Sequence, residues 1–211
     1  MRQTIEMASS AYKNDEGIVG VPTGLTDLDD RLGGLHKSDL IIIAGRPSMG
    51  KTALATNIAY NAASNKNEGK SVAFFSLEMS AEQLANRILA EQASLSSDQI
   101  RRGKLNKDDF SKLSEVSKEI SSNKLFIDDT PAINVSTLRT RARRLKRKLD
   151  TELGLIVVDY LQLMRGSKRY ENRVQEISEI TQGLKSVSKE LDVPILALSQ
   201  LSRAVEQRED K

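Results

Sequence analysis

The chain of 211 residues contains no cysteine and no tryptophan, and aromatic residues make up only 4% of it. The absence of cysteine excludes disulfide bonds and thiolate metal sites, and it suits a reducing compartment. The scarcity of aromatic rings argues against a protein that binds single strands mainly by stacking many bases. No apolar run reaches membrane-spanning length, and the first residues do not resemble a signal peptide. These features predict a soluble, cytoplasmic protein without a membrane partner.

Charged residues make up 29% of the chain, but they are nearly balanced and leave a net charge of +3. The charge of the whole chain therefore says little about its partners. The apolar fraction of 38% is modest, and a chain of this length can bury one substantial α/β core. We expect that core to consist mostly of leucine, isoleucine, valine and alanine.

From Ile18 onward, short apolar runs rich in branched side chains alternate with helical patterns. Each run is typical of a parallel strand buried on both faces, and the alternation predicts a mainly parallel sheet with right-handed helical crossovers. The expected strands are 40–44, 72–76, 125–128, 155–159 and 195–199. The expected helices are 51–64, 81–93, 107–122, 135–149 and 174–191. The pattern therefore predicts an α/β fold flanked by helices.

Three smaller features complete this organisation. Residues 1–17 are polar and weakly helical, and we interpret them as a linker-like segment before a domain of residues 18–211. Glycine-containing turns bracket residues 25–29, which predicts a short helix with Thr26 as its N-cap. The single histidine, His36, precedes the first strand and is expected at the surface rather than as a ligand.

The strongest chemical signal follows the first expected strand and has the pattern G-x-x-x-x-G-K-T. Its residues are Gly45, Arg46, Pro47, Ser48, Met49, Gly50, Lys51 and Thr52. The glycines allow a tight turn whose N–H groups point at phosphates, and the helix that begins at Lys51 adds its positive dipole end. Lys51 supplies a point charge, and Thr52 supplies a hydroxyl ligand for Mg²⁺. The motif predicts a site for a nucleoside triphosphate.

A second signal is Asp159, which ends a run of four apolar residues. A carboxylate at the carboxyl end of a buried parallel strand lies at the rim where α/β sheets bind ligands. There it can hold Mg²⁺ through water, or order Thr52. The alternative is an ordinary aspartate that starts a turn, but the presence of Lys51 and Thr52 favours the metal-binding role.

Two further polar residues follow expected strands. Glu78 is placed to orient and deprotonate the water that attacks a γ-phosphate. The alternative is an acid in the first turn of a helix, although Ser80 and Gln83 form a better capping box there. Gln200 ends the last strand, where its amide can sense the γ-phosphate or simply cap the strand. The residues alone leave both alternatives open.

Two basic regions remain. Residues 139–148 form a dense cationic helix, for which a solvated face is the default interpretation and a nucleic-acid or subunit surface the alternative. Residues 164–173, the basic loop, directly follow the strand that ends at Asp159 and are the better candidate for coupling hydrolysis to strand binding. The candidate DNA contacts are Arg165, Lys168, Arg169 and Arg203. For Arg203, the alternatives are a phosphate of nucleotide or of nucleic acid, or solvent, and the sequence does not decide between them.

Five segments in order carry a resemblance to a known family. They are residues 44–52, 75–80, 128–131, 158–164 and 198–203, which read AGRPSMGKT, FSLEMS, DDTP, VDYLQLM and LSQLSR. Together with the lead-in at 20–29, they resemble the motor domain of the DnaB family of bacterial replicative helicases. The similarity covers about residues 17–211, and the combination is far more specific than any one motif.

The resemblance implies a RecA-like fold, a homohexameric ring, a helicase loader as partner, and ATP-driven 5′→3′ translocation on single-stranded DNA. Carried over by position, Lys51 and Thr52 bind phosphate and Mg²⁺, and Asp159 is the Walker B acid. Glu78 is implied as the catalytic base and Gln200 as the coupling glutamine. These assignments are expectations from the family.

The chain also departs from the family pattern. The amino-terminal domain that engages primase is absent, so no primase contact is expected, and residues 1–17 resemble only the end of the linker after it. The chain stops at Lys211, before the further strands and the basic residues that reach a neighbour's γ-phosphate. We therefore expect a fold incomplete at its C-terminal end that binds ATP but hydrolyses it weakly and unwinds poorly. Whether it forms rings is left open.

Two other interpretations are kept. A RadA-like recombination ATPase shares the RecA core, but residues 46–49 and 160–163 favour DnaB. A non-enzymatic module that binds nucleotide and caps or inhibits a full-length ring is the other interpretation. Only that module is expected to join intact helicase and abolish its unwinding.

Overall fold

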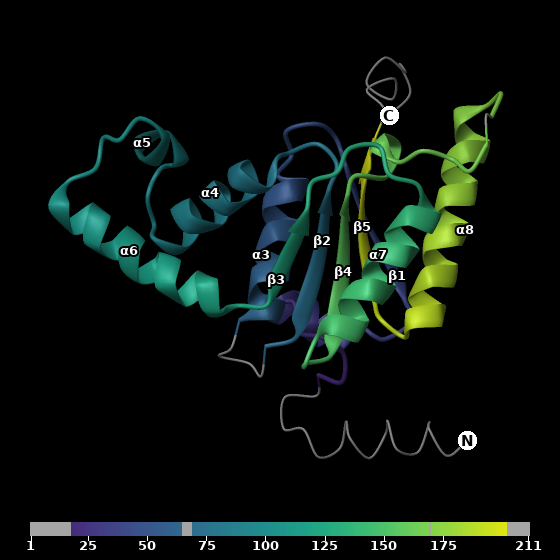
Figure 1. Cartoon of the computed structure of the whole chain (residues 1–211), viewed down its shortest axis with the longest axis horizontal. Helices are drawn as coiled ribbons and strands as arrows, with labels where there is room; N and C mark the ends of the chain where they lie inside the picture. Colours follow the sequence, from purple (N-terminus) through teal and green to yellow (C-terminus); the bar gives the residue numbers. More distant parts are fainter. Residues whose placement is uncertain (1–17, 65–68, 169, 202–211) are drawn as a thin grey trace.

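A five-stranded parallel sheet with helices on both faces organises the chain (Figure 1). The computed structural model describes residues 18–64, 69–168 and 170–201. The strands are β1 (Leu40–Gly45), β2 (Ser71–Ser76), β3 (Leu125–Asp128), β4 (Leu153–Asp159) and β5 (Ile195–Gln200). All five predicted strands are confirmed, and their ends differ from expectation by at most two residues, at β4. The order across the sheet is β1-β5-β4-β2-β3.

The helices follow the strands as crossovers. They are α2 (Thr26–Leu32), α3 (Lys51–Ala63), α4 (Ala81–Gln92), α5 (Ser97–Arg101), α6 (Lys107–Ser122), α7 (Val135–Lys148), α8 (Arg173–Leu191) and the short 3₁₀ helix η2 (Leu161–Leu163). The five long helices agree with the predicted ranges to within one residue at each end. Helix α5 and η2 were not predicted, because each is too short to show a periodic pattern. None of the helices in the described ranges is both long and apolar enough to cross a membrane.

Two apolar cores lie on opposite faces of the sheet. One joins α7 and α8 to the strands through residues such as Leu138 and Leu184, which are fully buried. The other joins α3 to the opposite face through residues such as Ile58 and Phe74. Alternate side chains of β2 and β4 supply both cores, which is why these strands are buried along their whole length.

Helices α4, α5 and α6 extend away from the sheet on the side of β3 (Figure 1). Helices α5 and α6 contain no fully buried residue, and Phe110 of α6 is 66% exposed. This arm is therefore held to the rest of the molecule mainly through α4, which begins directly after the segment that carries Glu78.

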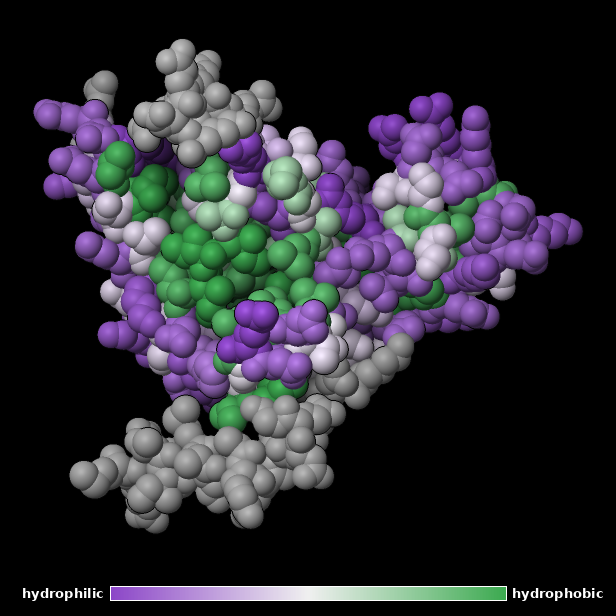
Figure 2. Space-filling view, turned by 180° about the vertical axis from the view of Figure 1, so that it is seen from behind, coloured by the Kyte–Doolittle hydropathy of each residue, from purple (hydrophilic) through white to green (hydrophobic). Residues whose placement is uncertain are grey.

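Strand β1 lies at one edge of the sheet and pairs only with β5 among the described residues. Its Ile42 side chain is 46% exposed, in contrast to the fully buried strands β2 and β4. The side of the molecule opposite to that in Figure 1 carries a broad apolar area (Figure 2). Exposed apolar surface of this extent is typical of a face that contacts other protein.

The predicted N-cap of the short helix α2 is wrong. Leu25 occupies the N-cap position without a side-chain cap, and Thr26 is already helical. The loop before the helix is held instead by the buried carboxylate of Asp29, which accepts hydrogen bonds from the backbone N–H groups of Thr23 (2.8 Å) and Gly24 (3.0 Å). The hydrogen-bond acceptor therefore lies inside the helix, in a position that the turn signals do not reveal.

We expect the substitution Asp29→Ala to lower the free energy of unfolding by about 1.5–3 kcal/mol, because buried N–H groups lose a charged acceptor. Urea denaturation measures this loss, with an unchanged dependence of stability on urea concentration. The control is Asp30→Ala, because Asp30 is the exposed neighbour in the same helix. Equal stability of the two variants would contradict the assigned role of Asp29.

Candidate nucleotide-binding site

The parallel sheet brings the carboxyl ends of its strands to one edge. Gly45 at the end of β1 lies in register with Gln200 of β5, and Ser76 at the end of β2 lies in register with Asp159 of β4. The backbone N–H of Leu201 also donates to the carbonyl oxygen of Gly45 at 3.0 Å. This edge is where open α/β sheets bind ligands. It therefore collects the predicted site residues from four separate segments of the sequence.

The predicted phosphate loop forms the turn between β1 and α3. Ser48 and Gly50 have φ angles of 62° and 82°, so the loop contains two residues in the left-handed region. Lys51 Nζ donates to the carbonyl oxygen of Arg46 at 2.8 Å, which folds the side chain back over the loop. A Cβ atom on Gly45 would lie 3.3 Å from the side chain of Lys51, so the glycine allows this close approach. Backbone of this shape and a helix N-terminus together favour an anion.

Most of the loop is open to solvent. Arg46, Ser48 and Gly50 are exposed, and Met49 is 73% exposed. Within the described part of the chain, Lys51 forms no ion pair with a carboxylate. The exposed loop is therefore accessible to a phosphate group from the solvent side.

Asp159 ends β4 at the same sheet edge and is only 1% exposed. Burial raises the pKa of its carboxyl group above the ordinary value, and the negative charge of Glu78 acts in the same direction. A hydrogen bond from Thr52 and the positive charges of Arg87 and Lys51 oppose this shift of the pKa. The Oδ2 atom of Asp159 is buried and has no hydrogen-bond partner among the residues that the structure describes. A buried carboxylate oxygen of this kind needs a partner, and a hydrated cation supplies one.

These residues fit Mg²⁺ bound together with a phosphate. Thr52 contributes a hydroxyl and Asp159 a carboxylate, which are the oxygen ligands that Mg²⁺ prefers. No cluster of three or more acidic, histidine or cysteine residues that could hold a metal occurs in the described ranges.

The segment that carries Glu78 is fixed by its neighbours. The N–H of Leu77 donates to the carbonyl oxygen of Asp159 at 2.7 Å, and Ser76 Oγ donates to the carbonyl oxygen of Met79 at 2.7 Å. Asp129 Oδ2 accepts from the N–H of Ala81, the first residue of α4, at 2.9 Å. The backbone on both sides of Glu78 is therefore tied to β4 and to the loop after β3.

The helix boundary places Glu78 outside α4. Ser80 is the N-cap, and its side chain and that of Gln83 form the predicted capping box. Glu78 therefore lies before the first turn of α4. A favourable interaction with the helix dipole in that turn does not explain why an acidic residue occupies this position. Its side chain is exposed at the same edge as Asp159. Its role in hydrolysis stays a prediction.

The sequence motifs do not predict a role for three further residues near this edge. Asp129 caps α4, Arg87 is a positive charge near Asp159, and Gln162 contacts the end of β5. Asp129 and Gln162 fall inside the segments that carry the DnaB resemblance, which was the available signal. Arg87 also lines a shallow cavity of about 450 Å³ between α4 and α5, next to Met79.

The candidate DNA contacts are only partly described. Arg165 and Lys168 are exposed on the loop after η2, and Lys168 Nζ lies 5.4 Å from the ring centroid of Tyr170. Arg169 and Arg203 lie outside the described residues. The basic helix α7 uses part of its charge internally, because Arg139 and Arg143 both pair with Glu190 of α8. The solvated face expected for that helix is therefore only part of its role.

We expect Asp159→Asn to stabilise the protein at neutral pH in the absence of nucleotide. Because folding raises the pKa of Asp159, the folded chain binds the proton more tightly than the unfolded chain. This contribution to stability is present at low pH and is lost as the pH rises through the folded-state pKa. The Asp159→Asn side chain does not ionise, so the variant does not lose this stability at neutral pH. We expect its free energy of unfolding to rise by about 1 kcal/mol, which corresponds to ~2–4 °C in Tm.

Thermal unfolding at several pH values between 4 and 8 measures this effect. Asp150→Asn is the control, since Asp150 is exposed. A lower Tm than wild type at neutral pH would contradict the view that burying the Asp159 carboxylate destabilises the fold.

Comparison with known proteins identifies relatives along the whole chain. The family model of the DnaB-like helicase C-terminal domain matches residues 20–211. The replicative DNA helicase DnaB of Rickettsia prowazekii is 54% identical over 217 residues, which cover 99% of this chain and 44% of that protein. The DnaB of Geobacillus stearothermophilus is 50% identical over 210 residues, with coverage of 99% and 45%. The chain thus spans under half the length of these relatives.

Solved structures lead to the same group. A DnaB-like replicative helicase, studied with its interactions with primase, superposes with a TM-score of 0.88 at 37% identity over 99% of this chain and 49% of that one. A second solved structure, of an ATPase domain, gives a TM-score of 0.90 at 36% identity over 99% of this chain and 73% of that one. These matches confirm the RecA-like α/β fold and the resemblance predicted from the motifs. The chain belongs to the family of DnaB-like helicase C-terminal domains.

Proposed function

We propose that this domain binds ATP and Mg²⁺ at residues 45–52 and couples hydrolysis to translocation on single-stranded DNA in replication. The observation that carries the proposal is the arrangement at one sheet edge. An open phosphate loop, a buried carboxylate oxygen without a partner in the described part of the chain and the hydrogen-bonded Glu78 segment meet there. Each part alone has a structural explanation, but together they match the requirements of phosphoryl transfer to water.

The phosphate loop and Lys51 bind the β- and γ-phosphates in this proposal. The loop N–H groups and the dipole of α3 favour the negative charge, and Lys51 exchanges the Arg46 carbonyl for phosphate oxygens. Thr52 and Asp159 hold Mg²⁺, directly or through water. When bound, the ion supplies positive charge that stabilises the phosphate oxygens of the transition state.

Glu78 orients the attacking water and accepts its proton. The tethers on Leu77, Met79 and Ala81 keep its backbone beside Asp159, so the carboxylate needs little reorganisation. Gln200 lies at the end of β5, in register with Gly45 of the phosphate loop. From there its side-chain amide senses whether a γ-phosphate is present.

The exposed charges of Arg165 and Lys168 contact the phosphates of single-stranded DNA, and we extend this proposal to Arg169 and Arg203. We also propose that the domain works in the cytoplasm within a homohexameric ring and meets a helicase loader. The family and the basic character of the loop support these assignments.

Two substitutions test the nucleotide site. Lys51→Ala removes the charge on the phosphates, and we expect Mg-ATP binding measured by calorimetry to weaken by at least about tenfold, or ~1.4 kcal/mol. Glu78→Gln keeps the shape but cannot accept the proton, so we expect binding within about twofold of wild type and hydrolysis lower by about 10²–10⁴-fold. Phosphate release measures the hydrolysis rate.

Matched controls separate these effects from general loss of charge. Lys104→Ala and Glu82→Gln change exposed residues of the arm and are expected to behave as wild type. Binding of Mg-ATP by Lys51→Ala at wild-type affinity would overturn the proposed site. Wild-type hydrolysis by Glu78→Gln would remove only the role given to Glu78.

A further inference from the structure

Gln162 occupies η2, directly after β4, and its side chain is bonded to the end of β5. Its Nε2 donates to Ser199 Oγ at 3.0 Å and to the carbonyl oxygen of Gln200 at 3.1 Å. Its Oε1 accepts from the backbone N–H of Gln200 at 3.1 Å. The amide therefore uses both its donor and acceptor sides on one strand end, which fixes its orientation.

These hydrogen bonds take the place of backbone pairing between β4 and β5, which stops before the end of β5. The register between β4 and β5 ends at the pair Val158 and Ala197, three residues before β5 itself ends. On its other side, β5 remains paired with β1 as far as Gln200 and Gly45. The side-chain amide of Gln162 bonds the backbone of Gln200, where β4 no longer offers a backbone partner. It thereby sets the position of Gln200 beside the phosphate loop.

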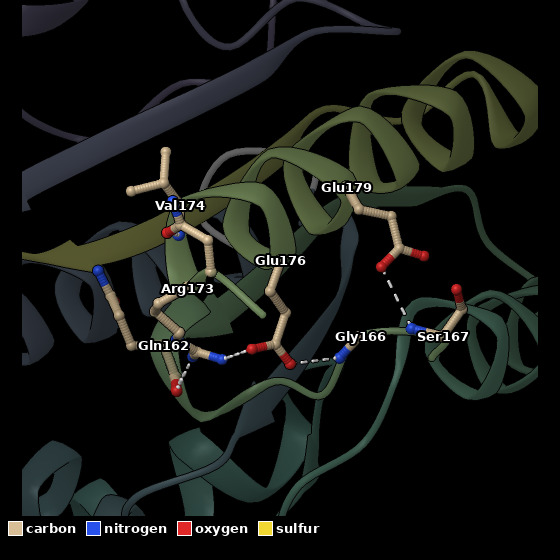
Figure 3. Close-up of polar contacts among 8 residues, drawn as sticks. Gln162, Gly166, Ser167, Arg173, Val174, Glu176 and Glu179 are labelled. Carbon is tan, nitrogen blue, oxygen red and sulfur yellow. Dashed lines mark hydrogen bonds and ion pairs between the residues drawn. The ribbon is translucent and has the colours of Figure 1, made fainter. Parts of the chain in front are cut away.

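The backbone of Gln162 is held in turn by the start of α8. Arg173 donates through Nη2 to the carbonyl oxygen of Gln162, and through Nη1 it pairs with Glu176 (Figure 3). A planar guanidinium that binds two partners keeps a fixed orientation between them. Arg173 is therefore the connection between η2 and the first turn of α8.

The same helix turn holds the basic loop. Glu176 Oε1 accepts from the N–H of Gly166 at 2.9 Å, and Glu179 Oε2 accepts from the N–H of Ser167 at 3.2 Å (Figure 3). The hydrogen bond from Gly166 and the charge of Arg173 lower the pKa of Glu176, so it stays ionised at neutral pH. Two successive backbone N–H groups of the loop thus donate hydrogen bonds to carboxylates of α8.

We propose that Gln162 is a positioning residue for Gln200, and that Gln162, Arg173 and Glu176 connect the nucleotide edge to the basic loop. When nucleotide binding moves Gln200, the amide of Gln162 moves with it and shifts Arg173. The hydrogen bond from the N–H of Gly166 to the carboxylate of Glu176 then changes, and Gly166 lies in sequence between the candidate DNA contacts Arg165 and Lys168. The inference rests on the proposed nucleotide function and adds a route between its two sites.

Amide hydrogen exchange of the whole chain tests this route without requiring hydrolysis. The ligand is Mg²⁺ with a non-hydrolysable ATP analogue at saturation, and the readout is exchange at Gly166 and Ser167. In wild type we expect nucleotide to change exchange there by at least about fivefold, the lower end of usual coupling. In Gln162→Ala we expect nucleotide affinity within about twofold of wild type but a loop response below about twofold.

Further variants separate positioning from stability. Gln162→Glu keeps the acceptor for the Gln200 N–H but loses both donors, so it tests the route if the alanine variant fails to fold. Arg173→Ala is expected to abolish the loop response, and combining it with Gln162→Ala is expected to add nothing. Gln175→Ala is the matched control, because Gln175 is an exposed amide residue of the same helix.

The outcomes are distinguishable. A wild-type chain that binds no nucleotide overturns the proposed function, and the inference falls with it. Nucleotide binding with no loop response in wild type overturns the inference alone. The inference alone is also overturned if Gln162→Ala, or Gln162→Glu where alanine does not fold, binds nucleotide and keeps the full response, or if the effects of the two substitutions simply add.

Discussion

Strand β5 is the last of the described strands along the chain, yet it pairs with both β1 and β4 and so joins the two halves of the candidate site. Without β5, the phosphate loop after β1 and the aspartate that ends β4 would not be joined within the described sheet. The pairing joins residues more than 150 positions apart, such as Leu40 and Ile195. The geometry of the nucleotide edge therefore depends on long-range pairing, and local structure around the motif alone cannot supply it.

Much of this architecture follows from the sequence, because a buried parallel strand and an amphipathic crossover helix leave strong periodic signals. The phosphate-loop motif and the acid at the end of 155–159 carry their own context. The residues that were missed share another property. Asp29, Asp129 and Gln162 each act on backbone groups outside their own element of structure, and such a bond leaves no pattern along the chain. Thr26 was wrongly chosen as a cap for the same reason.

The site edge also conflicts with the demands of stability. Asp159 is buried, one of its oxygens has no hydrogen-bond partner within the described ranges, and the negative charge of Glu78 raises its pKa further. In the phosphate loop, Ser48 adds conformational cost, because unlike Gly50 it is not a glycine and does not adopt the left-handed region freely. Unfavourable features that lie together at one sheet edge are typical of functional sites, where binding of a ligand offsets their energetic cost.

The exposed edge of β1 has a mechanical consequence. The strand runs straight into the phosphate loop, and within the described residues only β5 holds its backbone. A strand edge offers a row of N–H and C=O groups that accept another strand, and Ile42 adds apolar surface beside it. Any segment that docks along this edge would stiffen β1 and change how freely the loop adapts to phosphate. The free edge of β1 is therefore a place where contact with another segment would reach the phosphate loop without touching it.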